Sequence, residues 1–356
     1  MKISAFLKKK NIEFSAKRYF IDAMGAMAQG LFASLLIGTI FSTLGMLTSW
    51  QFFNDMGTFA KAVSGPAMAV AIGYALKAHQ LVLFSLLAVG YASNSLGGAG
   101  GPLAVFFIAI ISAECGKLVS KETKVDILVT PFVTIGVGSL LSIAFAGYIG
   151  QAANYIGNLI MWATDLQPFL MGIIVSVVVG IVLTLPISSA AICAALGLTG
   201  LAGGAALAGC CAQMVGFAFL SFKENKWGGL VSQGLGTSML QMPNIIRRPV
   251  IWLPAIITSA ITGPMATCLF KLQMNGTPVS SGMGTCGLVG PIGVYTGWLS
   301  PSEQAIGNGA SAIVPGAMDW IGLVLISLIL PAVITPLIGF LFRKLGWIRE
   351  GDLNLD

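Results

Sequence analysis

Two long segments of this 356-residue chain contain no lysine or arginine and consist mainly of apolar residues. One lies between Lys124 and Lys223, and the other between Lys271 and Arg343. A transmembrane helix needs about 20 consecutive apolar residues, and the apolar runs in these segments reach that length. A soluble domain of this size could not bury so much apolar surface. We therefore expect an all-α integral membrane protein.

The composition supports this expectation. Charged residues make up 9% of the chain, against about 25% in soluble domains, and the mean hydropathy is +0.89. The chain has 45 glycines, where average usage would give roughly 25. Glycine lets membrane helices approach closely and permits irregular backbone where protein or a water-filled cavity surrounds it. The composition thus favours a packed helical bundle that encloses a cavity over a simple membrane anchor.

Residues 1–22 combine basic and apolar side chains, which predicts an amphipathic segment lying on an anionic membrane surface. The apolar run that follows, 23–49, is too long for the core of a signal peptide. Nucleic acid is not an expected partner, because membrane anchoring accounts for the basic charge. The basic residues are Lys2, Lys8, Lys9, Lys10, Lys17 and Arg18.

The distribution of basic residues predicts the topology, because cytoplasmic loops are enriched in lysine and arginine. Both termini are basic, so we expect both in the cytoplasm of a multi-pass cell-membrane protein. About ten transmembrane helices are expected, arranged in a first half, 23–167, and a second half, 168–356. Glycine-rich breaks interrupt the apolar runs. In the first half the break makes either two short spans or a re-entrant hairpin, and in the second half a re-entrant hairpin is expected.

These broken segments are the candidate solute site, because transporters bind substrates at interrupted helices near the bilayer midplane. Their amide and hydroxyl groups, and the backbone groups that glycine leaves free, suit a neutral polar solute better than an ion. The alternative is a tight helix contact without a ligand. The candidates in the first segment are Asn94, Gly97 and Gly98. Those in the second are Asn275, Thr277, Pro278, Ser280, Ser281 and Gly282.

Two acidic residues complete the candidate solute site. Glu114 lies inside an apolar run, where a charged side chain at the bilayer centre costs about 2.5 to 3.5 kcal/mol. It either faces a cavity or reaches toward Lys117 at the membrane edge. Glu303 flanks the last irregular stretch and is the second acidic candidate.

No catalytic residue, metal site or cofactor is expected. The six cysteines show no CxxC spacing, which argues against zinc and against a disulfide framework. We interpret them as small buried packing residues. No nucleophile and base stand at helical spacing, and the single histidine, His79, lies in a loop.

The run from Asn275 to Pro291, with the glycine-rich first break and the basic N-terminus, resembles the enzyme IIC-like membrane proteins of the sugar phosphotransferase system. More narrowly, the chain resembles the branch that includes the perfringolysin-regulator-type membrane proteins. This resemblance implies a ten-span homodimer that moves a sugar or related neutral polar solute by alternating access. One half would supply much of the dimer contact, and the other would carry the solute between two hairpins.

The chain also departs from the sugar permeases. Their second hairpin carries a Thr-Glu-Pro run, whereas Thr277 here is followed directly by Pro278. Their transport domain offers a histidine, but His79 lies in the first half. Any IIA and IIB phosphocarrier proteins are expected as separate partners. A solute sensor or regulator, and a transporter without coupled phosphorylation, therefore stay open as alternatives.

Overall fold

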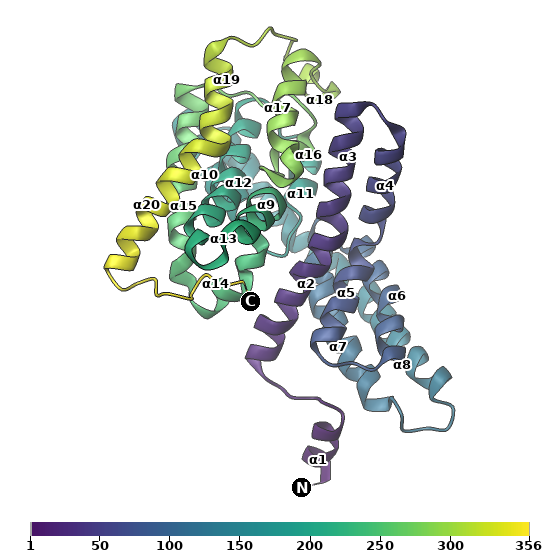
Figure 1. The fold of residues 1–356 in the computed structure, drawn as a ribbon. Coiled ribbons are helices and arrows are strands. Elements are labelled where there is room, and N and C mark those ends of the chain that lie inside the picture. The colour runs from purple at the N-terminus through teal and green to yellow at the C-terminus, as the bar shows by residue number, and fades with distance from the viewer. Residues whose placement is uncertain (1, 356) are drawn as a thin grey trace. The chain divides into compact units, whose positions relative to one another are not determined.

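The computed structural model describes residues 2–355, and its regular elements are helices (Figure 1). Within that range, the only extended pairing is an isolated antiparallel bridge between Gly200 and Met274. The expected all-α class is confirmed. Six helical stretches are long and apolar enough to cross a membrane, and the count of ten spans stays a prediction. The six are Arg18–Thr48, Gln80–Val119, Asp126–Thr164, Gly200–Leu220, Pro249–Leu269 and Ala317–Lys344.

The chain forms two compact units, Met1–Ala153 and Asn154–Asp356. The boundary falls inside α9 (Gly147–Thr164). Unit 1 contains α1 (Lys2–Lys9), η1 (Arg18–Ala23), α2 (Met24–Leu31), η2 (Phe32–Leu36), α3 (Ile37–Thr48), α4 (Gln51–Ala62), α5 (Ser64–Ala75), α6 (Gln80–Gly97), η3 (Gly98–Gly100), α7 (Gly101–Val119), α8 (Asp126–Leu141) and η4 (Ser142–Ala146).

Glycines allow the helices of unit 1 to pack closely. A methyl group on Gly90 of α6 would collide with the carbonyl of Gly65 in α5. In the same way, Gly138 brings α8 against Val89 of α6 and Ser112 of α7. Small residues drive helix association in membranes, where burying apolar surface gains little. Much of the glycine in unit 1 therefore serves packing.

Unit 2 is built around α12, which is buried along nearly its whole length. Helices α10, α15 and α20 pack against α12. The elements of unit 2 are α10 (Pro168–Thr184), α11 (Ser189–Ala195), α12 (Gly200–Leu220), α13 (Phe222–Val231), η5 (Ser232–Gly236), η6 (Ser238–Gln241), α14 (Met242–Arg247), η7 (Pro249–Trp252), α15 (Leu253–Pro264), η8 (Met265–Leu269), α16 (Pro278–Ser281), η9 (Cys286–Leu288), α17 (Val289–Leu299), α18 (Glu303–Gly307), α19 (Ala317–Val324), η10 (Leu325–Ile329) and α20 (Leu330–Lys344).

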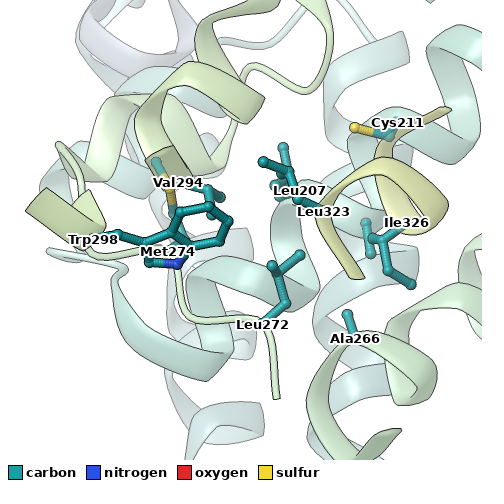
Figure 2. Packing of buried hydrophobic residues seen from close by; sticks show 10 residues of the cluster. Leu207, Cys211, Ala266, Leu272, Met274, Val294, Trp298, Leu323 and Ile326 are labelled. Carbon is teal, nitrogen blue, oxygen red and sulfur yellow. The ribbon is translucent and has the colours of Figure 1, made fainter. Parts of the chain in front are cut away.

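An apolar cluster holds the chain that leads into α16 (Figure 2). Leu272 and Met274 precede α16, and both are buried in this cluster. They pack with Leu207 of α12, Trp298 of α17 and Ile326 of η10. The irregular segment before α16 is thus anchored on at least three helices.

Most hydroxyl groups inside the helices are already bonded. Ser93 donates to the carbonyl of Val89 at 2.7 Å, and Thr134 donates to the carbonyl of Thr130 at 2.8 Å. In apolar surroundings such a bond to the preceding turn satisfies a hydroxyl that water cannot reach. The donor hydrogens of these hydroxyl groups are therefore already used within their own helices.

The cysteines follow the sequence interpretation with one clear exception. Cys193, Cys210, Cys211 and Cys286 are buried, whereas Cys115 is half-buried. The expectation of burial is wrong for Cys268, which lies exposed at the end of η8. Four of the six thiols therefore act as small packing groups in unit 2.

Candidate functional site

The first hairpin, α6–η3–α7, turns at Gly98. This residue has φ +50° and ψ −123°, a conformation that glycine adopts readily and residues with a Cβ rarely adopt. Helices α6 and α7 have 18 and 19 residues, or about 27 Å each at 1.5 Å per residue. The hydrocarbon core of a bilayer is about 30 Å thick. This geometry favours two short spans over a shallow re-entrant dip.

The candidate residues Asn94, Gly97 and Gly98 all lie at this turn. Asn94 is half-buried and packs against the backbone of α7, since a methyl group on Gly101 would lie 2.6 Å from Asn94 Oδ1. Gly97 is buried and lies close to Ala104. These residues therefore serve the turn itself, whatever else they bind.

Glu114, in α7, lies in an ion-paired cluster at the far end of the first hairpin. Its Oε2 lies 2.8 Å from Nζ of Lys117, which is 1% exposed. Lys117 also donates to the carbonyls of Asn11 at 2.9 Å and Leu76 at 3.0 Å. Tyr19 donates to Glu114 Oε1 at 3.3 Å. The cluster thus ties the N-terminal segment to α7 and to the end of α5. Glu114 reaches Lys117 and also faces a cavity, so the two expected alternatives occur together.

A cavity of about 340 Å³ adjoins this cluster. Apart from Glu114 and Tyr19 the cavity is lined by apolar side chains, which include Ile12, Phe14 and Ile111. Such walls offer a sugar few hydrogen-bond partners. The cavity is therefore a poor site for a polyhydroxylated solute.

The second hairpin, residues 272–288, has a different construction. Its helix α16 has only 4 residues, and Pro278 stands at its first position, where the missing N–H costs nothing. Before α16 the chain is extended, with Gly200 and Met274 exchanging both backbone hydrogen bonds at 3.0 Å. After α16, Gly284 and Gly287 have φ of +54° and +51°. The helix is thus interrupted on both sides.

A second short helix, α11, packs against α16. Ser188 caps α11 by accepting a hydrogen bond from the backbone N–H of Ala191 at 3.2 Å. Ser189 donates to the carbonyl of Gly282 at 2.7 Å, and a methyl group on Gly282 would lie 2.6 Å from the Ser189 carbonyl oxygen. Two broken helices from distant parts of the chain therefore meet inside unit 2.

The polar side chains of the second hairpin are neutral and mostly buried. Asn275 and Ser280 are 4% and 6% exposed and Ser281 is fully buried, whereas Thr277 is exposed. The Thr277 and Ser280 hydroxyls lie 2.9 Å apart, and Asn275 donates to Gln273 Oε1 at 3.2 Å. Of these four side chains, only Thr277 is exposed at the surface in this conformation.

Glu303 lies beside the hairpin but points to the surface. The neighbouring Ser302 caps α18. Its backbone N–H donates to the carbonyl of Asn275 at 2.9 Å, and its hydroxyl donates to the carbonyl of Gly276 at 2.8 Å. Glu303 itself is exposed. The structure thus joins the chain before α18 to the second hairpin, with the carboxylate outside the contact.

A buried polar cluster around Gln213 was not anticipated from the sequence. Gln213 is fully buried in α12, and its Oε1 accepts from Trp252 Nε1 at 2.8 Å and from Thr184 at 3.3 Å. Thr184 also lies 2.8 Å from the hydroxyl of Ser238. The available signal was a single amide within the apolar helix 200–220.

These arrangements offer hydrogen bonds rather than covalent chemistry. The second hairpin presents hydroxyl and amide groups and a glycine-rich backbone, which match the hydroxyl groups of a neutral polar solute. The first hairpin offers packing and an ion pair. Among the candidate segments, the second presents more neutral hydrogen-bonding groups.

One comparison with known proteins gives a match. A family model described as Phosphotransferase system, EIIC matches residues 21–355. No curated protein and no solved structure matches the chain. The matched range includes both hairpins and the Gln213 cluster.

Proposed function

The chain belongs to the EIIC family of the phosphotransferase system and is a permease-type, multi-pass membrane protein; from this premise, we propose that it binds a sugar or related neutral polar solute at the second hairpin. The observation that carries the proposal is the meeting of the broken helices α11 and α16 within unit 2. Interrupted helices are where transporters place their substrate sites.

In the proposed mechanism, Thr277 makes the first contact with the solute because its side chain is exposed. Movement of the hairpin then exposes Asn275 and Ser280 to the solute hydroxyls. Gly282 and Gly284 permit this movement because the surrounding backbone is already non-helical. Alternating access follows if the hairpin faces each side of the membrane in turn.

The family works with IIA and IIB phosphocarrier components, and we propose that they are separate partners here. Further parts of the proposal are a homodimer in the cell membrane, about ten spans in halves 23–167 and 168–356, and both termini in the cytoplasm. Light scattering in lipid nanodiscs tests the dimer. Membrane-impermeant labelling of engineered cysteines tests the position of the termini.

A solute sensor is the second candidate function. The specific observation in its favour is that no carboxylate stands between Thr277 and Pro278. A binding protein that does not hand its solute to a phosphocarrier has no need of that group. Binding without uptake would identify this function.

Uptake into proteoliposomes tests the proposal. A panel of labelled sugars is offered with and without phosphorylated IIB proteins. We expect one sugar to accumulate and Thr277→Val to reduce its uptake. The matched control is Thr296→Val, because the hydroxyl of Thr296 already donates to the carbonyl of Gly293 within α17, at 3.3 Å. Equal uptake by both variants would contradict the assignment of the second hairpin.

A further inference from the structure

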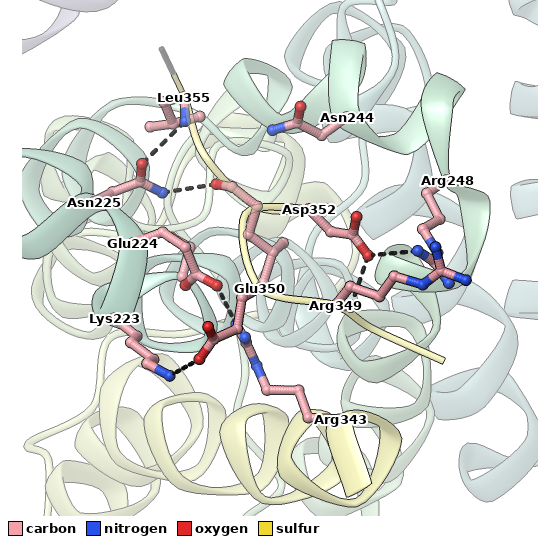
Figure 3. A network of polar contacts seen from close by, with 12 residues as sticks. Lys223, Glu224, Asn225, Asn244, Arg248, Arg343, Arg349, Glu350, Asp352 and Leu355 are labelled. Atoms are coloured by element: carbon pink, nitrogen blue, oxygen red, sulfur yellow. Dashed lines mark hydrogen bonds and ion pairs between the residues drawn. The ribbon is translucent and has the colours of Figure 1, made fainter. Parts of the chain in front are cut away.

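The C-terminal residues 348–355 turn back from α20 and lie against α13 and α14 in unit 2 (Figure 3). We call this segment the C-terminal strap. Leu353 is fully buried and Ile348 is 2% exposed. The other residues of the strap are exposed or half-buried. The strap is therefore held by few apolar anchors and depends on its polar contacts.

Amide side chains bind the strap through its backbone. Asn225 donates to the carbonyl of Leu353 at 2.8 Å and accepts from the N–H of Leu355 at 3.0 Å. Gln241 donates to the same Leu353 carbonyl at 3.0 Å, and Asn244 donates to the carbonyl of Asn354 at 2.6 Å. Residues 350–353 of the strap form a turn, and the three amide side chains hold the backbone of that turn. We call the surface that carries Asn225, Gln241 and Asn244 the groove.

Charge complementarity selects an acidic peptide for this groove. Arg248 lies 3.1 Å from Asp352, with both side chains mostly shielded from solvent. Lys223 also pairs with Glu350, but this pair lies at the exposed edge and adds little to the hold on the strap. Ion pairs at a surface weaken as salt rises, so the strap is held by contacts that water and ions can replace.

A short chain of contacts joins the strap to the second hairpin. Gln241, which holds Leu353, also donates to Gln233 Oε1 at 3.0 Å. Gln233 lies in η5, and the next residue, Gly234, accepts a hydrogen bond from the hydroxyl of Thr285. Thr285 is fully buried at the end of the second hairpin. The strap therefore supports the loop to which the hairpin is bonded.

We propose that the C-terminal strap is a releasable self-peptide in this groove, and that its release loosens the second hairpin. The inference rests on the proposed function only in taking that hairpin as the solute site. The groove would accept a free peptide with an acidic residue followed by a buried leucine, as in Asp352-Leu353. Occupancy of the groove would then regulate solute movement.

The test uses the thiol of Cys286, which follows Thr285 directly and is 1% exposed. In the full-length protein in detergent, without solute, the rate of N-ethylmaleimide labelling at Cys286 is measured by peptide mass spectrometry. The exposed Cys268 serves as the internal reference. Leu353→Asp should expel the strap and raise the Cys286 rate. A rise of about 5- to 150-fold corresponds to typical coupling between sites.

Two further variants distinguish release of the strap from general unfolding of the protein. Asn225→Ala removes both backbone hydrogen bonds but no apolar anchor, and it should raise the rate in the same direction. Glu350→Gln is the matched control, because its pair with Lys223 has side chains 79% and 68% exposed. This control should stay within about two-fold of wild type, as expected for a surface ion pair.

A synthetic peptide of residues 349–355, added to the Leu353→Asp protein, should restore slow labelling. The proposal is overturned if hydrogen exchange shows the strap released in Leu353→Asp and Asn225→Ala while Cys286 labels as in wild type. It is also overturned if the peptide does not slow labelling. Because no solute is present, either failure leaves the uptake experiment standing. If no sugar is taken up, the effect of strap release on Cys286 labelling can still be measured.

Discussion

The two glycine-rich hairpins have similar compositions but different structures. In the first, glycine makes one tight turn at Gly98 between two helices of 18 and 19 residues. In the second, glycine surrounds a helix of 4 residues and an extended stretch. The first hairpin ends in the ion pair of Glu114 and Lys117, whereas the polar groups of the second are neutral. Similar glycine content therefore gives two different backbone structures, and only the second places neutral hydrogen-bonding groups beside a short, interrupted helix.

The largest expected change is a loss of stability when the ion pair between Glu114 and Lys117 is broken, and it tests whether this pair has a structural role. In Lys117→Gln, Glu114 loses its ion-pair partner at 9% exposure. Breaking a buried ion pair by removing one member costs about 3 to 5 kcal/mol. We expect a corresponding loss of thermal stability in detergent, measured by size-exclusion chromatography after heating.

Glu114→Gln provides the comparison for that variant. It leaves Lys117 with the two backbone carbonyls of Asn11 and Leu76, so its destabilisation should be smaller. Solute affinity should stay at the wild-type value. A loss of affinity without a loss of stability would instead return Glu114 to the solute site.

A smaller loss of stability is expected in the second hairpin. In Gly282→Val, the new side chain would meet the Ser189 carbonyl oxygen at 2.6 Å from its Cβ. Overpacking of this kind costs about 1 to 3 kcal/mol. The control is Gly228→Ala, where a methyl group meets nothing within 4 Å. Thermal stability of the two variants should differ clearly, and equal values would mean that α11 and α16 do not pack closely.

The smallest effect concerns the N-terminal segment and depends on pH. Lys10 lies 2.5 Å from Glu122, and the hydrogen bond from Lys10 holds the pKa of the Glu122 carboxyl below its usual 4.5. A carboxyl with a depressed pKa stabilises the folded state above its unfolded pKa, and this stabilisation is lost as the pH falls through the folded value.

The melting temperatures of wild type and Glu122→Gln are therefore compared from about pH 3 to pH 7, across the usual carboxyl range. We expect wild type to be slightly more stable above pH 4.5, and the difference to vanish at the acid end. Glu13→Gln is the control, because Glu13 is 66% exposed and 4.0 Å from Arg18. A difference that persists at low pH would show that the charge of Glu122 is not its cause.

Much of the fold could be predicted from the sequence. The segments without lysine or arginine indicated membrane helices, because charge is excluded from the hydrocarbon core. The run from Asn275 to Pro291 indicated the family that the chain belongs to. These features depend on local composition and motif, which the sequence displays directly.

The rest depended on contacts between distant residues. Asn225 and Leu353 are 128 positions apart, and the strap has no periodic pattern that would indicate a groove. Gln213 was a single amide in an apolar helix, and its partners Thr184 and Trp252 lie on other elements. Tertiary contacts of this kind leave no local signal.

Solute affinity in the two hairpins tests the central claim most directly. Once uptake has identified the solute, calorimetry compares Asn275→Ala and Thr277→Val with Asn94→Ala. A lost hydrogen bond contributes about 0.5 to 1.5 kcal/mol, and an unsatisfied buried partner costs about 1 to 3 kcal/mol. At about 1.4 kcal/mol per factor of ten, the first two variants should weaken binding roughly three- to a hundred-fold. Asn94→Ala should bind as wild type. The account is contradicted if Asn94→Ala loses affinity while the other two variants retain it.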